Sequence, residues 1–214
     1  TMSSTEIDST RTAVLVDFGG VLTSSVHTAF EEFGASIGVD PRLPIRLLAS
    51  DDVAKKLLSD HESGRIDEDE FSHGFAERLG VGGVTVDPGG LVQRMMAGLT
   101  ADPATLAVIE DVRAAGVPVA LVSNAFGRDC YNGFDLQSLA DVVVISSEIG
   151  VRKPSRKIYQ IACDRLGVQT EQAVMIDDLQ QNLDGAARLG IAGVLHTGAE
   201  DTRRQLAERF GIGA

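Results

Sequence analysis

The chain has 214 residues, of which 43% are hydrophobic and 23% are charged, a composition typical of a globular protein with a substantial core. Its 31 acidic residues outnumber its 19 basic ones and give a formal net charge of −12, which leaves too few cations to neutralise a nucleic-acid backbone. No apolar run is long enough to span a membrane, and the polar first residues lack the apolar core of a secretion signal. We therefore expect a cytoplasmic protein that binds neither nucleic acid nor membrane. We expect it to be a monomer or a homodimer.

Five short runs of apolar residues predict β-strands. They span residues 12–18, 117–123, 142–146, 173–176 and 192–196. None of them alternates with polar residues, which is typical of parallel strands covered by helices on both faces. From the second run onward, helical segments such as 154–166 and 179–189 separate the strands. This alternation predicts an α/β fold, with a three-layer Rossmann-like core around a parallel sheet.

The segment between the first and second strands departs from this alternation. It contains almost no strand signal and five helix-like stretches, which span residues 26–37, 44–49, 51–61, 68–79 and 90–97. Breakers such as Pro41 and Gly64 separate these stretches. We interpret residues 23–97 as an inserted α-helical cap domain, and residues 11–22 and 98–214 as the core domain.

Acidic side chains follow the first and fourth predicted strands. Asp17 comes directly after the run 13–16, and the pair Asp177–Asp178 follows the fourth run. Because ligands of an open parallel sheet bind beyond the carboxyl ends of its strands, we expect these three carboxylates in one crevice. Their mutual repulsion would raise their pKa values unless a divalent cation relieved it. Since Mg²⁺ prefers hard oxygen ligands and often bridges carboxylates to a phosphate, these residues predict a magnesium site.

Hydroxyl, amide and basic side chains complete the predicted crevice. The second strand ends in Ser123, which can donate a hydrogen bond to a phosphate oxygen, and Asn124 follows it. Lys153, in the loop after the third strand, can supply the positive charge that this acidic protein lacks elsewhere. We expect Pro154 in the first turn of the next helix. For Asn182, one helical turn beyond Asp178, two alternatives stay open: a supporting hydrogen bond to the site, or an exposed amide.

Together these segments resemble the haloacid dehalogenase-like hydrolase superfamily, in its phosphatase branch with a small helical cap. The matching motifs lie at residues 14–22, 121–124, 152–159 and 175–187, in the order and with the spacing of that superfamily. The insertion point of the cap, just after the first motif, is similar too. A set of four ordered motifs is far more specific than any one of them.

The resemblance implies a magnesium cofactor and its ligands. Asp17 and Asp177 would bind Mg²⁺ directly, and Asp178 would bind it directly or through water. The backbone carbonyl of Gly19 would be a further ligand.

The resemblance also implies the catalytic and substrate-binding residues. Asp17 would be the nucleophile, and Lys153 would tie it to the substrate. Ser123 and the backbone amide of Asn124 would hold the transferring phosphoryl group. The implied activity is Mg²⁺-dependent hydrolysis of a small phosphomonoester through an aspartyl-phosphate intermediate.

One position departs from the phosphatases of this superfamily. Most of them carry a second Asp two residues after the nucleophile, which protonates the leaving group, and here that position is Gly19. Such acid–base assistance is worth about 10²- to 10⁴-fold. Three alternatives stay open: a phosphatase whose substrate leaves easily, such as a sugar phosphate; a metal-free 2-haloacid dehalogenase, whose halide needs no proton; and a non-catalytic phosphate-binding or regulatory protein. The pair Asp177–Asp178 disfavours the dehalogenase, and the presence of every other motif residue disfavours the third alternative.

Overall fold

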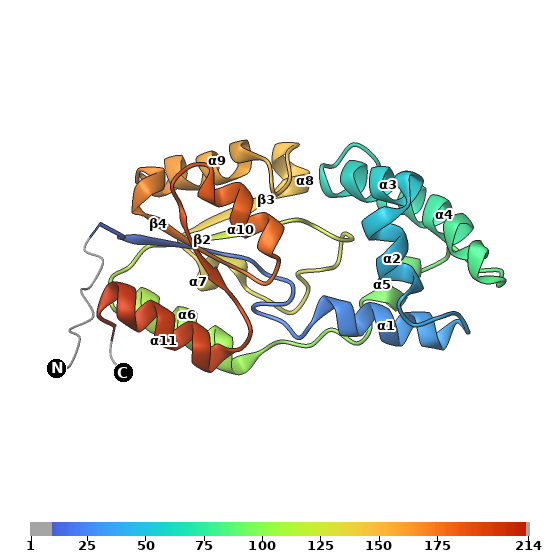
Figure 1. Cartoon of the computed structure of the whole chain (residues 1–214), viewed down its shortest axis with the longest axis horizontal. Helices are drawn as coiled ribbons and strands as arrows, with labels where there is room; N and C mark the ends of the chain where they lie inside the picture. Colours follow the sequence, from blue (N-terminus) through green and yellow to red (C-terminus); the bar gives the residue numbers. More distant parts are fainter. Residues whose placement is uncertain (1–9, 213–214) are drawn as a thin grey trace.

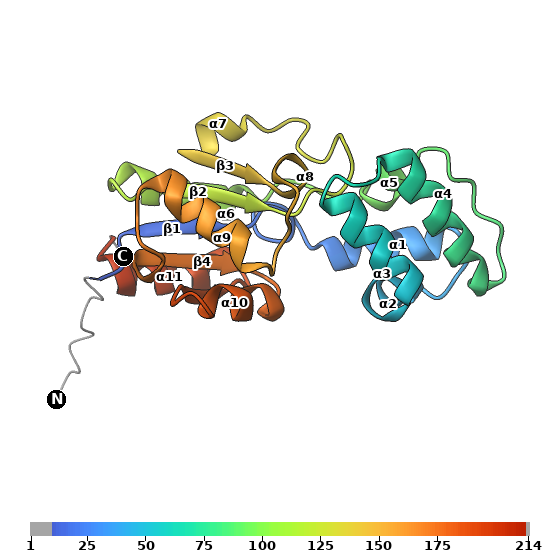
Figure 2. The same ribbon diagram turned by 90° about the horizontal axis from the view of Figure 1, so that it is seen from above.

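Five parallel strands form one sheet in the computed structural model, which describes residues 10–212. The strands are β1 (Ala13–Val16), β2 (Val119–Ser123), β3 (Val142–Ile145), β4 (Ala173–Asp177) and β5 (Ala192–Leu195). Their order across the sheet is β3-β2-β1-β4-β5, with β1 between β2 and β4 (Figure 2). The chain fills one side of β1 first and then the other, which creates a topological switch point beside β1. The predicted α/β fold is confirmed.

Helices cover both faces of the sheet and produce the three layers (Figures 1 and 2). One face carries α6 (Pro103–Ala114), α7 (Leu136–Leu139) and α11 (Ala199–Phe210). The other face carries α9 (Arg156–Leu166) and α10 (Gln180–Ala187). The short helix α8 (Ser146–Ile149) follows β3. Val14 packs toward α6, whereas its neighbour Leu15 packs toward α9. Since β1, β2 and β4 are buried on both faces, their sequences are apolar without alternation.

The start of α9 differs from the sequence expectation. Ser155 is the N-cap and its side chain accepts a hydrogen bond from the Lys157 N–H, so the helix begins at Arg156. Pro154 therefore precedes the helix and does not lie in its first turn, and its peptide bond with Lys153 is cis.

The 3-10 turn η2 (Thr170–Gln172) directly precedes β4, and the remaining helices form a cap beyond the carboxyl ends of the strands (Figures 1 and 2). They are α1 (Val26–Ser36), α2 (Leu43–Ser50), α3 (Asp52–Glu62), α4 (Glu68–Leu79), the 3-10 turn η1 (Gly80–Gly82) and α5 (Leu91–Met95). Their apolar faces meet in a cluster of their own, around Phe33, Phe71 and Phe75. Within residues 10–212, no helix is long and apolar enough to cross a membrane.

Two connections and contacts from core loops join the cap to the core. The chain enters and leaves the cap side by side, where the Ser24 N–H donates to the Thr100 carbonyl at 2.7 Å. After β2, Phe126 inserts among cap aromatic rings, and the Gly127 N–H donates to Nε2 of His61 in α3 at 2.9 Å. The boundaries at residues 22–23 and 97–98 stay a prediction, and the paired connections support it.

Candidate active site

Three carboxylates meet at the carboxyl ends of β1 and β4. The two strands are neighbours, and the Asp17 N–H donates to the Ile176 carbonyl at 2.9 Å, which sets Asp17 beside the end of β4. One carboxylate oxygen from each of Asp17, Asp177 and Asp178 lies within 4.8 Å of the other two. The structure thus brings together three residues that the sequence separates by up to 161 positions (178 minus 17).

Lys153 supplies a buried positive charge to this cluster. Its Nζ donates to Oδ1 of Asp17 at 2.7 Å and to Oδ2 of Asp177 at 2.8 Å, and the residue is only 2% exposed. Burial opposes its charged form, but the two carboxylates outweigh burial and raise the pKa of Lys153. Lys153 therefore stays an ammonium ion and fixes the geometry of both Asp side chains.

One ammonium does not balance three carboxylates. Burial raises the pKa of Asp17 to about 8, with Asp177 and Asp178 adding to this effect and Lys153 opposing it. Burial, and then the charge of Asp177, also raise the pKa of Asp178. This excess of negative charge, presented by hard oxygen donors, fits a divalent cation such as Mg²⁺.

Neighbouring groups hold Asp177 in place. Nδ2 of Asn182 donates to its two carboxylate oxygens at 3.1 and 3.2 Å, and the Leu179 N–H donates to Oδ1 at 2.9 Å. Tyr159 in turn donates its hydroxyl to the Asn182 carbonyl at 2.6 Å. Of the two alternatives for Asn182, the structure therefore has the supporting hydrogen bond and not the exposed amide.

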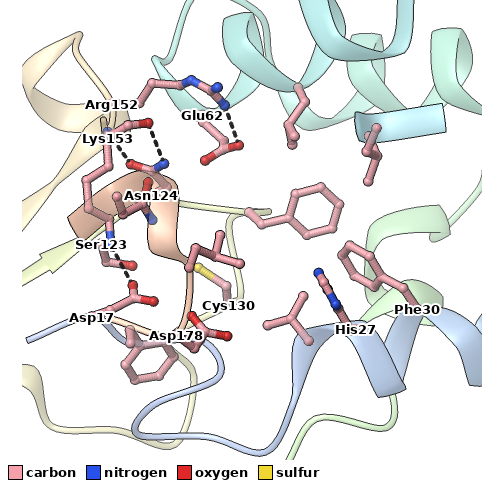
Figure 3. A pocket seen from close by; sticks show the side chains of 18 of the residues that line it. Asp17, His27, Phe30, Glu62, Ser123, Asn124, Cys130, Arg152, Lys153 and Asp178 are labelled. Carbon is pink, nitrogen blue, oxygen red and sulfur yellow. Dashed lines mark hydrogen bonds and ion pairs between the residues drawn. The ribbon is translucent and has the colours of Figure 1, made fainter. Parts of the chain in front are cut away.

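Ser123 and Asn124 lie beside Asp17 and Lys153 (Figure 3). The hydroxyl of Tyr131 donates to Oγ of Ser123 at 2.6 Å, so the Ser123 proton is directed elsewhere and can be donated to a substrate oxygen. Oδ1 of Asn124 accepts from the Lys153 N–H at 2.8 Å, and its Nδ2 donates to the Lys153 carbonyl at 3.1 Å. The Asn124 side chain thus positions Lys153. The role of its backbone amide stays a prediction.

The glycines after Asp17 make room for this arrangement. At Gly20, φ is +82°, and a Cβ atom there would lie 2.2 Å from Oδ2 of Asp178. Only glycine lets the loop pass this close to the carboxylate. At Gly19, which lines the same cavity as Asp17, a Cβ atom would lie 3.1 Å from Cγ2 of Val26. The role of the Gly19 carbonyl as a metal ligand stays a prediction.

A cavity of about 680 Å³ extends from Asp17 to the cap. Glu62, at the end of α3, lies in its wall and is paired with Arg152 at 2.9 Å (Figure 3). Burial raises the pKa of Glu62 to about 7, and Arg152 partly offsets this effect. Neither this pair nor the Tyr131–Ser123 contact was predicted from the sequence, because no local pattern marks either one.

Comparison with known proteins identifies the family. Residues 12–190 match the family model described as haloacid dehalogenase-like hydrolase, so the chain belongs to this family of hydrolases. It is 31% identical to (S)-2-haloacid dehalogenase 4A of Burkholderia cepacia over 112 residues, which cover 49% of this chain and 48% of that protein. It is 21% identical to sesquiterpene phosphatase astK of Aspergillus oryzae over 202 residues, which cover 93% and 96%. The chain thus spans about half of the dehalogenase, and it spans 10% of a longer mouse relative.

A solved structure shows the same fold. A HAD family enzyme from Bacteroides thetaiotaomicron, determined as a magnesium complex, superposes with a TM-score of 0.66 at 22% identity. The match covers 87% of this chain and 93% of that one. The shared architecture confirms the Rossmann-like core with a helical cap that the sequence predicts.

Proposed function

We propose that the protein is a Mg²⁺-dependent hydrolase of a small phosphomonoester. The observation that carries this proposal is the convergence of Asp17, Asp177 and Asp178 around the buried ammonium of Lys153, at one end of a cavity of about 680 Å³. A cavity of this size accommodates an organic substrate larger than phosphate alone. The match to a relative named as a phosphatase over nearly its whole length supports the proposal.

Each residue has a defined part in the proposed reaction. A carboxylate oxygen of Asp17 bonds to phosphorus while the ester P–O bond breaks, and the departing alkoxide takes a proton from water. Water then attacks phosphorus in the aspartyl phosphate, which releases phosphate and regenerates Asp17. Ser123 donates to an equatorial phosphoryl oxygen, and Lys153 holds Asp17 in line.

Magnesium would add charge neutralisation to these contributions. Asp17, Asp177, Asp178 and the Gly19 carbonyl are the groups that would hold it. When bound, Mg²⁺ supplies electrostatic stabilisation of the transferring phosphoryl group.

A metal-free haloacid dehalogenase is the second candidate, because a dehalogenase is among the relatives and Gly19 offers no acid for a leaving alkoxide. The charge of the site argues against it. Three carboxylates facing one ammonium repel the carboxylate of a 2-haloacid unless a cation is present. A non-catalytic protein, the third alternative, would bind Mg²⁺ and phosphate without turnover.

Phosphate release separates these functions. Acetyl phosphate and p-nitrophenyl phosphate need little leaving-group protonation, and we expect turnover of both with Mg²⁺ and none in EDTA. Asp17→Asn should abolish turnover, whereas Asp129→Asn, at an exposed position outside the site, serves as the matched control and should retain it. Normal activity of Asp17→Asn would refute the assignment of the nucleophile. Chloride release from 2-chloropropionate in EDTA would instead establish the dehalogenase.

A further inference from the structure

We propose that the substrate is the phosphate ester of an apolar, hydrocarbon-rich alcohol and not a sugar phosphate. This inference rests on the proposed phosphatase function and concerns the part of the cavity that lies beyond the phosphoryl site.

The cap wall of the cavity is largely apolar. Among its lining side chains are those of Val26, Phe30, Leu48, Leu58, Met96 and Phe126. They come from α1, α2, α3, the residue after α5 and the loop after β2, so five separate segments place apolar groups on one concave surface. Figure 3 shows Phe30 at the side of this cavity opposite Ser123 and Lys153.

These side chains are not simply the core of the cap. Phe30 is buried, but the other five are only half-buried and pack against the edge of the cap cluster. Their remaining apolar surface faces the cavity. A concave surface of this kind, next to a few polar groups at one end, is the usual form of a site for a largely apolar ligand.

Several polar groups around the cavity already have partners. Arg152 is paired with Glu62 at 2.9 Å, and Lys56 is paired with Asp60 while its side chain stays 76% exposed. Asn124 makes two hydrogen bonds to the backbone of Lys153.

Four further lining residues, His27, Lys55, Ser59 and Gln181, offer few partners to a buried ligand. His27, Lys55 and Gln181 are exposed to solvent, and Ser59 is half-buried. A sugar would therefore lose water from several hydroxyl groups without gaining enough partners, which is unfavourable for each unmatched group. An alkyl group has no such requirement and gains by covering the apolar wall.

A matched pair of substrates tests the proposal. Cyclohexylmethyl phosphate and glucose 6-phosphate both present a six-membered ring and release a primary alcohol, so the absence of an acid at position 19 affects both alike. We expect kcat/KM to be about tenfold or more higher for the cyclohexylmethyl ester. Along a series of n-alkyl phosphates, kcat/KM should rise by about fourfold per methylene until the cavity is filled. A flat series, or equal or better cleavage of glucose 6-phosphate, would overturn the proposal.

Two variants on one helix locate the effect. Leu58 of α3 faces the cavity, whereas Val53 of the same helix is 53% exposed and lies outside it. Leu58→Gln should lower the ratio of the two kcat/KM values by about fivefold, and Val53→Gln should leave this ratio unchanged. Because both substrates are measured on one preparation, the ratio does not depend on the fraction of folded enzyme. Equal ratios in the two variants would also contradict the proposal.

Acetyl phosphate separates failure of the substrate class from failure of the function. It carries almost no apolar group, so its Mg²⁺-dependent turnover reports the chemistry at Asp17 alone. Turnover of acetyl phosphate without discrimination between the paired substrates would refute only the apolar leaving group. No turnover of acetyl phosphate would refute the phosphatase function and this inference with it.

Discussion

Replacing Asp17 with Asn should make the metal-free protein more stable, although it should abolish activity. The substitution removes one of three crowded carboxylates and keeps the shape of the side chain. Lys153 retains Asp177 as an ion-pair partner at 2.8 Å, so its charge stays compensated. The remaining cluster has two carboxylates and one ammonium, which relieves the repulsion that the wild-type protein contains in the absence of a cation.

The pKa of Asp17 sets the size and the sign of this effect. The group has a pKa of 3.8 when unperturbed and about 8 in the folded protein. Between these values the unfolded chain has lost the proton that the folded protein still binds, so wild-type stability falls as pH rises, by about 1.36 kcal/mol per pH unit. The advantage of Asp17→Asn should be near zero below pH 4, about 2 kcal/mol at pH 5, and at most about 6 kcal/mol above pH 8.

Urea unfolding in EDTA at a series of pH values measures this difference. Asp129→Asn is the control, because its side chain is exposed and its free energy of unfolding should follow the wild-type values. Adding Mg²⁺ should stabilise the wild-type protein and reduce the advantage of Asp17→Asn, since the cation binds the folded state. If Asp17→Asn were less stable than wild type at pH 8 in EDTA, the crowding of the three carboxylates would be refuted.

Three further substitutions test the rest of the site. Lys153→Met leaves the buried carboxylates of Asp17 and Asp177 without their cation. It should lower the free energy of unfolding by about 3–5 kcal/mol in urea titrations. A loss below about 1 kcal/mol would mean that these carboxylates are solvated. Gly19→Asp introduces an acid, and Val26→Ala is combined with it because a Cβ atom at position 19 would lie 3.1 Å from Cγ2 of Val26. This double variant should accelerate alkyl phosphate cleavage by up to about 10²-fold and p-nitrophenyl phosphate cleavage much less. Equal acceleration of the two substrates would show that leaving-group protonation is not limiting. Tyr131→Phe removes the hydroxyl that donates to Ser123. It should lower kcat/KM by about fivefold and leave the circular dichroism spectrum unchanged. An unchanged kcat/KM would show that Ser123 does not need this hydrogen bond.

The sequence predicted those parts of the site that depend on the sheet alone. A fully buried parallel strand is apolar throughout, so the end of the apolar run marks the point where Asp17 or Ser123 emerges. Parallel pairing then forces these strand ends to one edge of the sheet, which is why residues far apart in the chain could be placed together.

The contacts that the sequence did not predict depend on how the cap and the loops pack. Glu62 and Arg152 are 90 positions apart, and their pairing follows from the docking of α3 against the loop after β3. The Tyr131 hydroxyl reaches Ser123 only because the loop after β2 folds back over the strand end. The start of α9 was misplaced because the side chain of Ser155 caps the helix, so that Pro154 stays outside it.

A crystal structure of the protein with Mg²⁺ and beryllium trifluoride, which mimics a phosphoryl group on a carboxylate, tests the central claim most directly. We expect beryllium bonded to a carboxylate oxygen of Asp17, with fluorine atoms within hydrogen-bonding distance of Ser123 and Lys153. Magnesium should lie between Asp17, Asp177 and Asp178. A fluoride complex on any other residue, or magnesium bound away from these three carboxylates, would contradict the proposed nucleophile and metal site.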